Sequence, residues 1–482
     1  MTADLELCYL PATDALRRFR ARELSPVELM AAVIERTEEV DGVVNALVVR
    51  HFERAMDQAR AAAARYMGRG AAPRALEGLP VGIKDEVPIE GDPCASGSLV
   101  TKDEIATHTA PIAERILAAG GIAHARTAAP EFSTAGFTHS RLWGVTVTPW
   151  NRAFSSGGSS GGSGAALAAG MATLASGSDI GGSIRIPAAF CGVVGFKPPF
   201  GRVPVDPPFN LDQYCHDGPM ARTVADAALF ENVIAGPHPR DIVSLRPKLE
   251  IPSQLEGIRG LRVGLSVNLG DYPVDPDVER EARTAAAALG DAGATVVEVD
   301  PGLSHHEVTE LLLAHFGLLW ANGLAKAVEA HPDLVTPYLV ALVERGRAAL
   351  SRIGAYGGLE REAAVQQRIL AVLEDVDVLV CSTLAASGLP AGDDLVSGPF
   401  EVGGRLHDYF FDWSMTPPFN IASRCPVLAV PSGFADNGVP TGVQIVGRTY
   451  DDVTVFRVGA ALERERPWLD VPARRPVIGP PG

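Results

Sequence analysis

Serine hydroxyls and one lysine are the residues of this chain best suited to nucleophilic chemistry. The stretch from Ser155 to Ala189 reads SSGGSSGGSGAALAAGMATLASGSDIGGSIRIPAA and contains no acid or base before Asp179. A serine nucleophile needs a base, and a neutral lysine can serve where the site has no histidine. Lys84 is the candidate, because it ends the apolar segment LPVGIKD, where burial favours the uncharged amine. Taken alone, Lys84 fits an ordinary strand-end lysine equally well.

Other known site chemistries fit this glycine- and serine-rich run poorly. It contains no GK[ST] of a phosphate loop, and Leu167 stands where a dinucleotide fingerprint needs glycine. The elbow pattern GxSxG matches formally at residues 157–161, but no apolar strand precedes it and only His407 lies late in the chain. Gly, Ser and Ala also do not make a lipid-facing span. The run therefore predicts a buried helix that other backbone approaches closely.

Composition narrows the class of protein. A hydrophobic content of 46% over 482 residues can bury a large core, and a net charge of -16 disfavours binding to nucleic acid or to anionic lipid. The N-terminus lacks the basic end and apolar run of a signal peptide, which predicts a cytoplasmic protein. Six cysteines without a CxxC pair, and histidines without HExxH, predict no metal and no cofactor. We expect a small-molecule substrate and no membrane partner, and the sequence leaves a homodimer open.

The order of expected elements predicts an α/β fold. Helical periodicity runs from Pro11 to Arg65, with Ser25 as an N-cap, and residues 304–371 are mostly helical. Expected strands and helices alternate elsewhere, with strands at 79–85, 121–127, 260–267, 295–300, 376–383 and 425–433, and helices at 110–120 and 275–293. This rhythm predicts one large domain with a mixed, largely parallel central sheet covered by helices on both faces. We expect residues 1–70 to form a helical segment packed on an α/β core of residues 71–482.

Several segments together resemble the amidase signature hydrolases. They are GLPVGIKD, the run SSGGSSGGSGAALAAG continuing through GSDIGGSIRIPAAFCGVVGFKP, then GPMARTVADAALF and PPFNIASRCPVLAVPSGF with GVPTGVQIVG. Lys84 precedes Ser159 by 75 residues (159 - 84), and Ser183 follows Ser159 by 24 (183 - 159), as in the family pattern. The resemblance extends over most of the chain.

The resemblance implies a single amidase-signature domain and a catalytic triad. Ser183 would be the nucleophile, Ser159 a proton bridge on a cis peptide, and Lys84 the final base. The glycines of DIGGSIR would let the backbone N–H groups of Ile180, Gly181, Gly182 and Ser183 face one point as an oxyanion hole. Asp179 and Arg185 fit structural anchors of this loop better than reactants.

The resemblance leaves the substrate open, since Ala128, Pro199, Ser423 and Arg424 depart from the family pattern around the expected pocket. Aromatic side chains of two segments, without lysine or arginine, predict a pocket for neutral aryl or aliphatic amides, with carbamates and esters as further substrates. These are Phe209, Tyr214, Tyr409, Phe410, Phe411 and Trp413. The alternatives are the amidotransferase component that acts on mischarged tRNA and shares this fold, and a catalytically silent scaffold.

Overall fold

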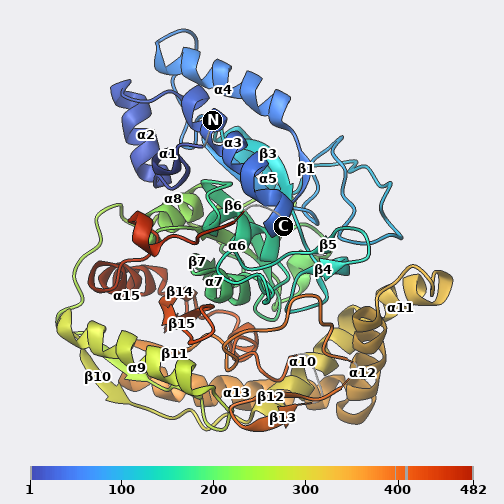
Figure 1. Ribbon diagram of the computed structural model, residues 1–482. Coiled ribbons are helices and arrows are strands. Elements are labelled where there is room, and N and C mark those ends of the chain that lie inside the picture. Colours follow the sequence, from blue (N-terminus) through green and yellow to red (C-terminus); the bar gives the residue numbers. More distant parts are fainter. Residues whose placement is uncertain (1–2, 397, 408–410, 480–482) are drawn as a thin grey trace.

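A large mixed β-sheet runs through the molecule from β1 to β10 (Figure 1). The computed structural model describes residues 3–396, 398–407 and 411–479. The sheet has 11 strands among these residues, and their spatial order is β1 (Leu47–Arg50), β3 (Ile122–Thr127), β2 (Pro80–Lys84), β6 (Leu174–Asp179), β8 (His216–Ala221), β7 (Val194–Lys197), β14 (Val427–Phe434), β15 (Pro440–Gly447), β11 (Val378–Ser382), β9 (Arg262–Leu265) and β10 (Thr295–Glu298). Two short hairpins, β4 (His139–Ser140) with β5 (Gly144–Val145) and β12 (Phe400–Val402) with β13 (Arg405–His407), lie outside it.

The sheet is mixed, as the sequence predicts, but the expectation of a largely parallel sheet is wrong. Among the described strands, parallel pairing joins β2 to β3 and β6, and β9 to β10 and β11. The other six neighbouring pairs of the sheet are antiparallel. The middle of the sheet departs from the βαβ rhythm, because β14 and β15 form a hairpin and β8 returns antiparallel to both β6 and β7.

Helices cover both faces of the sheet, which confirms that expectation. Val378 and Val380 face one apolar cluster while Leu379 and Cys381 face another, since successive strand residues point to opposite sides. The first cluster includes helices α2 (Ala12–Ala21), α5 (Pro111–Ala118), α8 (Val224–Ile234), α9 (Pro276–Asp291) and α15 (Asp452–Glu465). The opposite face packs against α6 (Gly161–Ala168), α7 (Arg185–Cys191), α10 (His305–Leu319), α12 (Pro337–Ile353) and α13 (Ala355–Asp375).

The N-terminal helices pack against the core at the β1 end of the sheet (Figure 1). They are α1 (Leu5–Cys8), α3 (Pro26–Val44) and α4 (Phe52–Tyr66), together with α2. Ser25 caps α3 as expected, because its hydroxyl accepts from the N–H of Val27 while Glu28 accepts from the N–H of Ser25. The Tyr9 hydroxyl donates to the carbonyl of Ala168 at 2.8 Å, which ties this segment to α6. The boundary at residue 70 stays a prediction.

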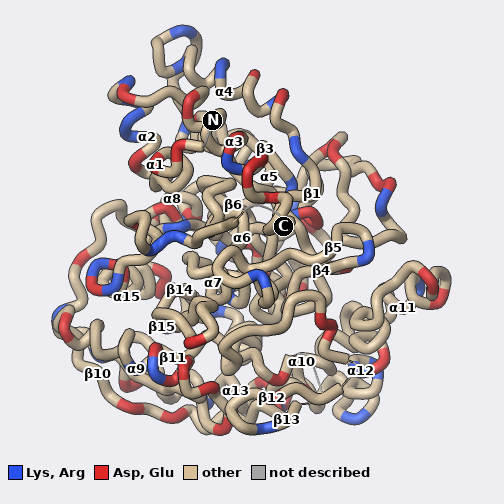
Figure 2. The backbone as a smooth tube through the Cα atoms, in the orientation of Figure 1, with Lys and Arg blue, Asp and Glu red and all other residues tan. Residues whose placement is uncertain are grey.

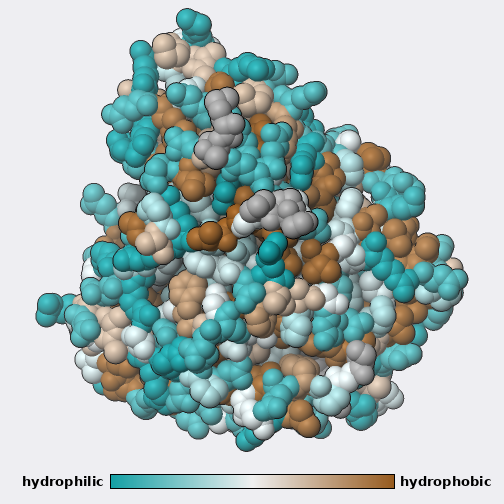
Figure 3. Space-filling view, in the orientation of Figure 1, coloured by the Kyte–Doolittle hydropathy of each residue, from teal (hydrophilic) through white to brown (hydrophobic). Residues whose placement is uncertain are grey.

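Two short helices complete the fold near the site, α11 (Ala321–Ala330) and α14 (Pro418–Ile421). No single described helix has the length and apolarity to cross a membrane, and α10 with α11 meets that test only as a pair bent by 68°. All six cysteines are free thiols. Figure 2 shows acidic and basic residues interspersed along the outer elements, and Figure 3 shows small hydrophobic groups between hydrophilic ones on this face.

Candidate active site

Lys84 ends β2 and has no exposed surface. Its ammonium nitrogen Nζ lies 2.7 Å from Ser159 Oγ, 2.8 Å from Ser178 Oγ and 2.9 Å from Glu86 Oε1. Three acceptors match the three N–H donors of a lysine ammonium. The structure therefore brings the predicted base into contact with one of the two predicted serines.

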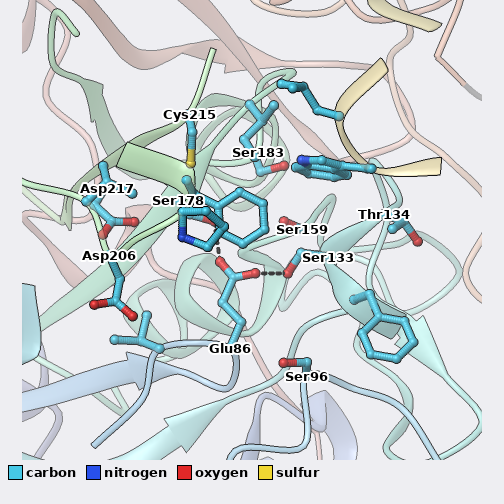
Figure 4. A pocket seen from close by; sticks show the side chains of 18 of the residues that line it. Glu86, Ser96, Ser133, Thr134, Ser159, Ser178, Ser183, Asp206, Cys215 and Asp217 are labelled. Atoms are coloured by element: carbon cyan, nitrogen blue, oxygen red, sulfur yellow. Dashed lines mark hydrogen bonds between the residues drawn. The ribbon is translucent and has the colours of Figure 1, made fainter. Parts of the chain in front are cut away.

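Glu86 is a functional candidate that the sequence reasoning missed. Its carboxylate pairs with Lys84 and accepts hydrogen bonds from the hydroxyls of Ser133 and Ser178 (Figure 4). Burial raises the pKa of Glu86, but Lys84 and the two hydroxyls outweigh burial and bring that pKa below its usual value. The signal was present in KDEV, where an acid follows the lysine by two residues.

The glycine- and serine-rich run folds as a buried turn followed by helix α6. Every residue of α6 is buried, which confirms the predicted close-packed helix. The peptide between Gly158 and Ser159 is cis, as the resemblance implies. A Cβ atom on Gly158 would lie 2.2 Å from the carbonyl oxygen of Phe137, so only glycine fits there. This packing holds Ser159, which is 1% exposed, against Lys84.

A buried ion pair fixes the loop that carries Ser183. The Asp179 carboxylate contacts the Arg185 guanidinium at 2.9 Å and accepts from the N–H groups of Gly182 and Ile184. Arg185 also donates to the side chains of Gln444 and Asn420. Burial raises the pKa of Asp179, but Arg185 and Asn420 outweigh burial and hold it well below its usual range. Asp179 and Arg185 act as the structural anchors that the sequence predicts.

The same loop limits the choice of oxyanion donors. Gly182 N–H donates to Asp179 Oδ1 at 2.9 Å, so it is not free to face a substrate carbonyl, and the prediction for Gly182 as a donor is wrong. The N–H groups of Ile180, Gly181 and Ser183 make no hydrogen bond within the described chain. The carbonyl of Gly181 accepts from Thr416 Oγ1 at 2.6 Å, which orients this peptide. Three N–H groups therefore remain as candidate donors.

A cavity of about 440 Å³ opens over Ser159 and Ser183. Figure 4 shows both serines on its wall, with Ser183 half-buried. No hydrogen bond joins the two hydroxyls in the described structure, and contacts of this kind commonly tighten only when substrate binds. Within the described residues no group of His, Cys, Asp and Glu is arranged to hold a metal ion.

The structure only partly matches the predicted aromatic pocket. Phe209 and Phe411 line the cavity. Tyr214 and Trp413 are fully buried outside it, Tyr214 stacked on His315 at 3.6 Å and Trp413 beside Phe190. Tyr409 and Phe410 lie outside the described residues.

Much of the apolar wall was missed, because a general helical pattern between 304 and 371 does not indicate which face meets a distant loop. The helices α10 and α11 and the loops around them contribute Phe132, Phe316, Leu319, Trp320 and Leu324. Phe316 and Trp320 stack with their ring centres 5.0 Å apart. These residues make one side of the cavity apolar and partly aromatic.

Comparison with known proteins assigns this fold and site to a class. Residues 28–456 match the Amidase family. The chain is 34% identical to an acylamidase of Rhodococcus erythropolis over 96% of this chain and 97% of that one. A solved bacterial aryl acylamidase of the amidase signature family superposes with a TM-score of 0.89 at 30% identity, covering 97% of this chain and 99% of that one. A solved 6-aminohexanoate cyclic dimer hydrolase superposes with a TM-score of 0.83 at 29% identity, covering 98% of this chain and 99% of that one.

Relatives with a different printed activity match over the same length. The chain is 35% identical to a glutamyl-tRNA(Gln) amidotransferase component, the GatA-type chain of Chloroflexus aggregans, over 96% of this chain and 98% of that one. Similarity over the whole chain therefore does not by itself distinguish an amidase from an amidotransferase component.

The fold and site define a hydrolase that acts on C–N bonds of linear amides. The chain belongs to the amidase signature family. This membership confirms the family that the sequence motifs indicate.

Proposed function

We propose that the chain hydrolyses aryl and aliphatic amides through a serine acyl-enzyme, with Ser183 as nucleophile, Ser159 as proton bridge and Lys84 as base. The observation that carries the proposal is the 2.7 Å contact between Lys84 Nζ and Ser159 Oγ at the wall of the cavity that Ser183 also lines. A lysine held against a serine in a water-poor cavity can accept a proton through that hydroxyl.

The proposed reaction begins when Ser183 Oγ attacks the amide carbonyl carbon. The Ser183 proton moves to Ser159 Oγ as the Ser159 proton moves to Lys84 Nζ. N–H groups among Ile180, Gly181 and Ser183 stabilise the oxyanion. The proton then returns by the same path to the leaving amine as the C–N bond breaks. Water, deprotonated by the same relay, hydrolyses the ester and releases the acid.

The carboxylate of Glu86 has a defined part in this cycle. When Lys84 holds the proton, it is an ammonium 2.9 Å from Glu86 Oε1. A fixed negative charge at that distance stabilises the positive charge formed during attack. Glu86 thus positions and compensates Lys84 without touching the reacting carbonyl.

The cavity supports apolar amides rather than anionic ones. Its described wall carries aromatic and aliphatic side chains together with Glu86, Asp206 and Asp217, and no lysine or arginine. An anionic substrate would find no cationic partner on that wall. Aryl or medium-chain amides should therefore be hydrolysed faster than acetamide or a dicarboxylic monoamide. Carbamates and esters with similar groups present the same carbonyl to the oxyanion donors.

Alanine variants of the triad test the mechanism. We expect Ser183→Ala and Lys84→Ala to lower kcat for a neutral anilide by roughly 10⁴-fold or more with the fold intact. Ser159→Ala should be less severe, because water can replace the bridging hydroxyl. Ser163→Ala is the control, since Ser163 Oγ donates to the Ser176 carbonyl at 2.8 Å in the same run. A folded Ser183→Ala protein with near-wild-type turnover would contradict the mechanism.

A fluorophosphonate probe and a substrate panel separate the alternatives. Covalent labelling at Ser183, measured by mass spectrometry, is expected of the hydrolase and not of a silent scaffold. A preference for glutamine over neutral anilides in kcat/KM would favour the amidotransferase component instead. Release of aniline from neutral anilides, without tRNA or ATP, supports the amidase.

A further inference from the structure

Three carboxyl groups line the cavity over the two serines. They belong to Glu86, Asp206 and Asp217, and none of the other described lining residues is basic. Figure 4 shows Asp206 and Asp217 close together on one side of the cavity, with Glu86 nearer to Ser133. One part of the cavity is therefore acidic, opposite in character to the apolar part formed by α10 and α11.

Two of these carboxylates already have partners. Glu86 pairs with Lys84 and with two serine hydroxyls. Asp206 Oδ2 lies 2.7 Å from His108 Nε2, and Arg240 approaches Asp206 Oδ1 only to 3.7 Å, so Oδ1 is buried without a hydrogen bond. Asp206 thus keeps one oxygen without a close donor.

Asp217 has no partner for its side chain among the described residues, although it is only 8% exposed and lines the cavity. It lies in β8, directly opposite Ser178 of β6, whose hydroxyl contacts Lys84. Cβ atoms of directly opposite residues in an antiparallel pair are about 5 Å apart, so Asp217 stands beside the lysine and serine network.

An unpaired buried carboxylate is unfavourable unless a cation or donor meets it. Burial, and then the nearby Glu86, raise the pKa of Asp217 to about 8. Lys84 opposes this rise, while Asp206 and Asp241 add to it. Nothing in the described protein neutralises this group, and it faces the space that a substrate would fill.

We propose that Asp217, with Asp206 beside it, binds a protonated amine of the substrate, so that amides carrying an ammonium group on a short apolar chain are preferred over their neutral isosteres. The proposal rests on the proposed amidase function and names its substrate class. The chain of the substrate would pack on Phe316 and Trp320 while the ammonium reaches Asp217. It keeps the expectation that anions are rejected and replaces a neutral substrate with a cationic one.

Pairs of substrates that differ by one terminal group test the proposal. On the acyl side they are the 4-nitroanilides of 5-aminopentanoic and hexanoic acid, and on the amine side N-(4-aminobutyl)hexanamide and N-pentylhexanamide. Each pair exchanges –NH₃⁺ for –CH₃ at equal length. We expect kcat/KM at pH 7 to favour the ammonium member at least about tenfold in one pair. That pair identifies the side of the scissile bond that faces Asp217.

Variants assign the preference to the carboxylates. Asp217→Asn should bring the kcat/KM ratio of the favoured pair close to one, and Asp206→Asn should lower it partly. Using a ratio removes any general change in activity. Asp103→Asn is the control, because it also removes one negative charge but its side chain is 86% exposed and outside the cavity lining. If Asp217→Asn does not fold, Asp206→Asn carries the test.

The outcomes separate this proposal from the proposed function. A wild-type enzyme that hydrolyses the hexanoyl anilide but shows no ammonium preference in either pair overturns the cation site alone. An unchanged ratio in Asp217→Asn also overturns it. If no amide is hydrolysed and no probe labels Ser183, the amidase mechanism fails. Calorimetric binding of pentylammonium against pentan-1-ol, with and without Asp217→Asn, then decides on the cation site by itself.

Discussion

At the scale of single residues, the charge beside Lys84 is the feature that most affects the proposed chemistry. Lys84 has no exposed surface, and its ammonium would be a buried charge without Glu86. Glu86 is itself held by hydroxyls of Ser133 and Ser178, which fix the carboxylate where the lysine needs it. The pair therefore compensates the positive charge of each catalytic cycle.

Glu86→Gln tests this compensation. Glutamine keeps the shape and an acceptor oxygen but removes the negative charge, so we expect kcat for a neutral anilide to fall roughly 10- to 100-fold. KM should change little, because Glu86 does not need to contact a neutral substrate. Steady-state kinetics across pH 6–9 provides the measurement.

Ser133→Ala is the matched control for that variant. It deletes one hydrogen bond to Glu86 and leaves the charge in place. We expect a smaller loss of kcat than in Glu86→Gln. Equal kcat values for Glu86→Gln and the wild type would show that the carboxylate has no part in turnover.

At the scale of elements, the loop from β6 to α7 determines where Ser183 lies. Gly182 has a φ of 126°, and a Cβ there would lie 1.9 Å from Thr416 Oγ1. Gly181 has an ordinary φ, and its Cβ would come no closer than 3.6 Å to its nearest neighbour, Leu312. Two neighbouring glycines thus have different reasons to be present.

Alanine at each of these glycines gives a paired prediction. Gly182→Ala should destabilise the protein by roughly 1–3 kcal/mol and displace Ser183, because both the backbone conformation and the space forbid a methyl group. Gly181→Ala should stay near wild type in stability. Urea unfolding and kcat/KM for one anilide measure both effects. Wild-type stability in Gly182→Ala would contradict the packing described for Thr416.

The sequence predicts elements more reliably than their arrangement. β2, β3, β9, β11 and the helices between them follow from local apolar patterns, which are visible in one stretch of chain. β8 reads HDGPMA, and its glycine and proline hide a strand that pairs with β6 and β7. Strand direction depends on such distant pairings, so the largely parallel sheet could not be corrected from local pattern.

The site shows the same division. Lys84 and Ser159 carry long motifs, and the structure joins them by one hydrogen bond. Glu86, Asp206 and Asp217 come from three distant segments, and only folding brings them to one cavity. The use of Gly182 N–H by Asp179 is likewise a matter of loop geometry that residue types do not indicate.

At the scale of the whole molecule, several carboxyl groups are buried without adequate partners. Glu231 of α8 is 2% exposed, and neither of its oxygens has a hydrogen-bond partner among the described residues. Burial, and then Asp452, raise the pKa of Glu231 well above its usual value, against the opposing effect of Arg202. Glu231 does not line the cavity described above, so its effect belongs to stability.

The raised pKa of Glu231 predicts how stability depends on pH. Above the ordinary carboxyl pKa of about 4.3, the unfolded chain releases a proton that folded Glu231 retains, so this group makes the folded state less stable as pH rises. Glu231→Gln removes the titration. Its free energy of unfolding relative to wild type should therefore increase between pH 5 and pH 8, by up to about 1.4 kcal/mol per pH unit. Urea unfolding at several pH values measures the trend. Glu256→Gln, at an 84% exposed side chain, should show none, and a flat difference for Glu231→Gln would mean that Glu231 ionises normally in the fold.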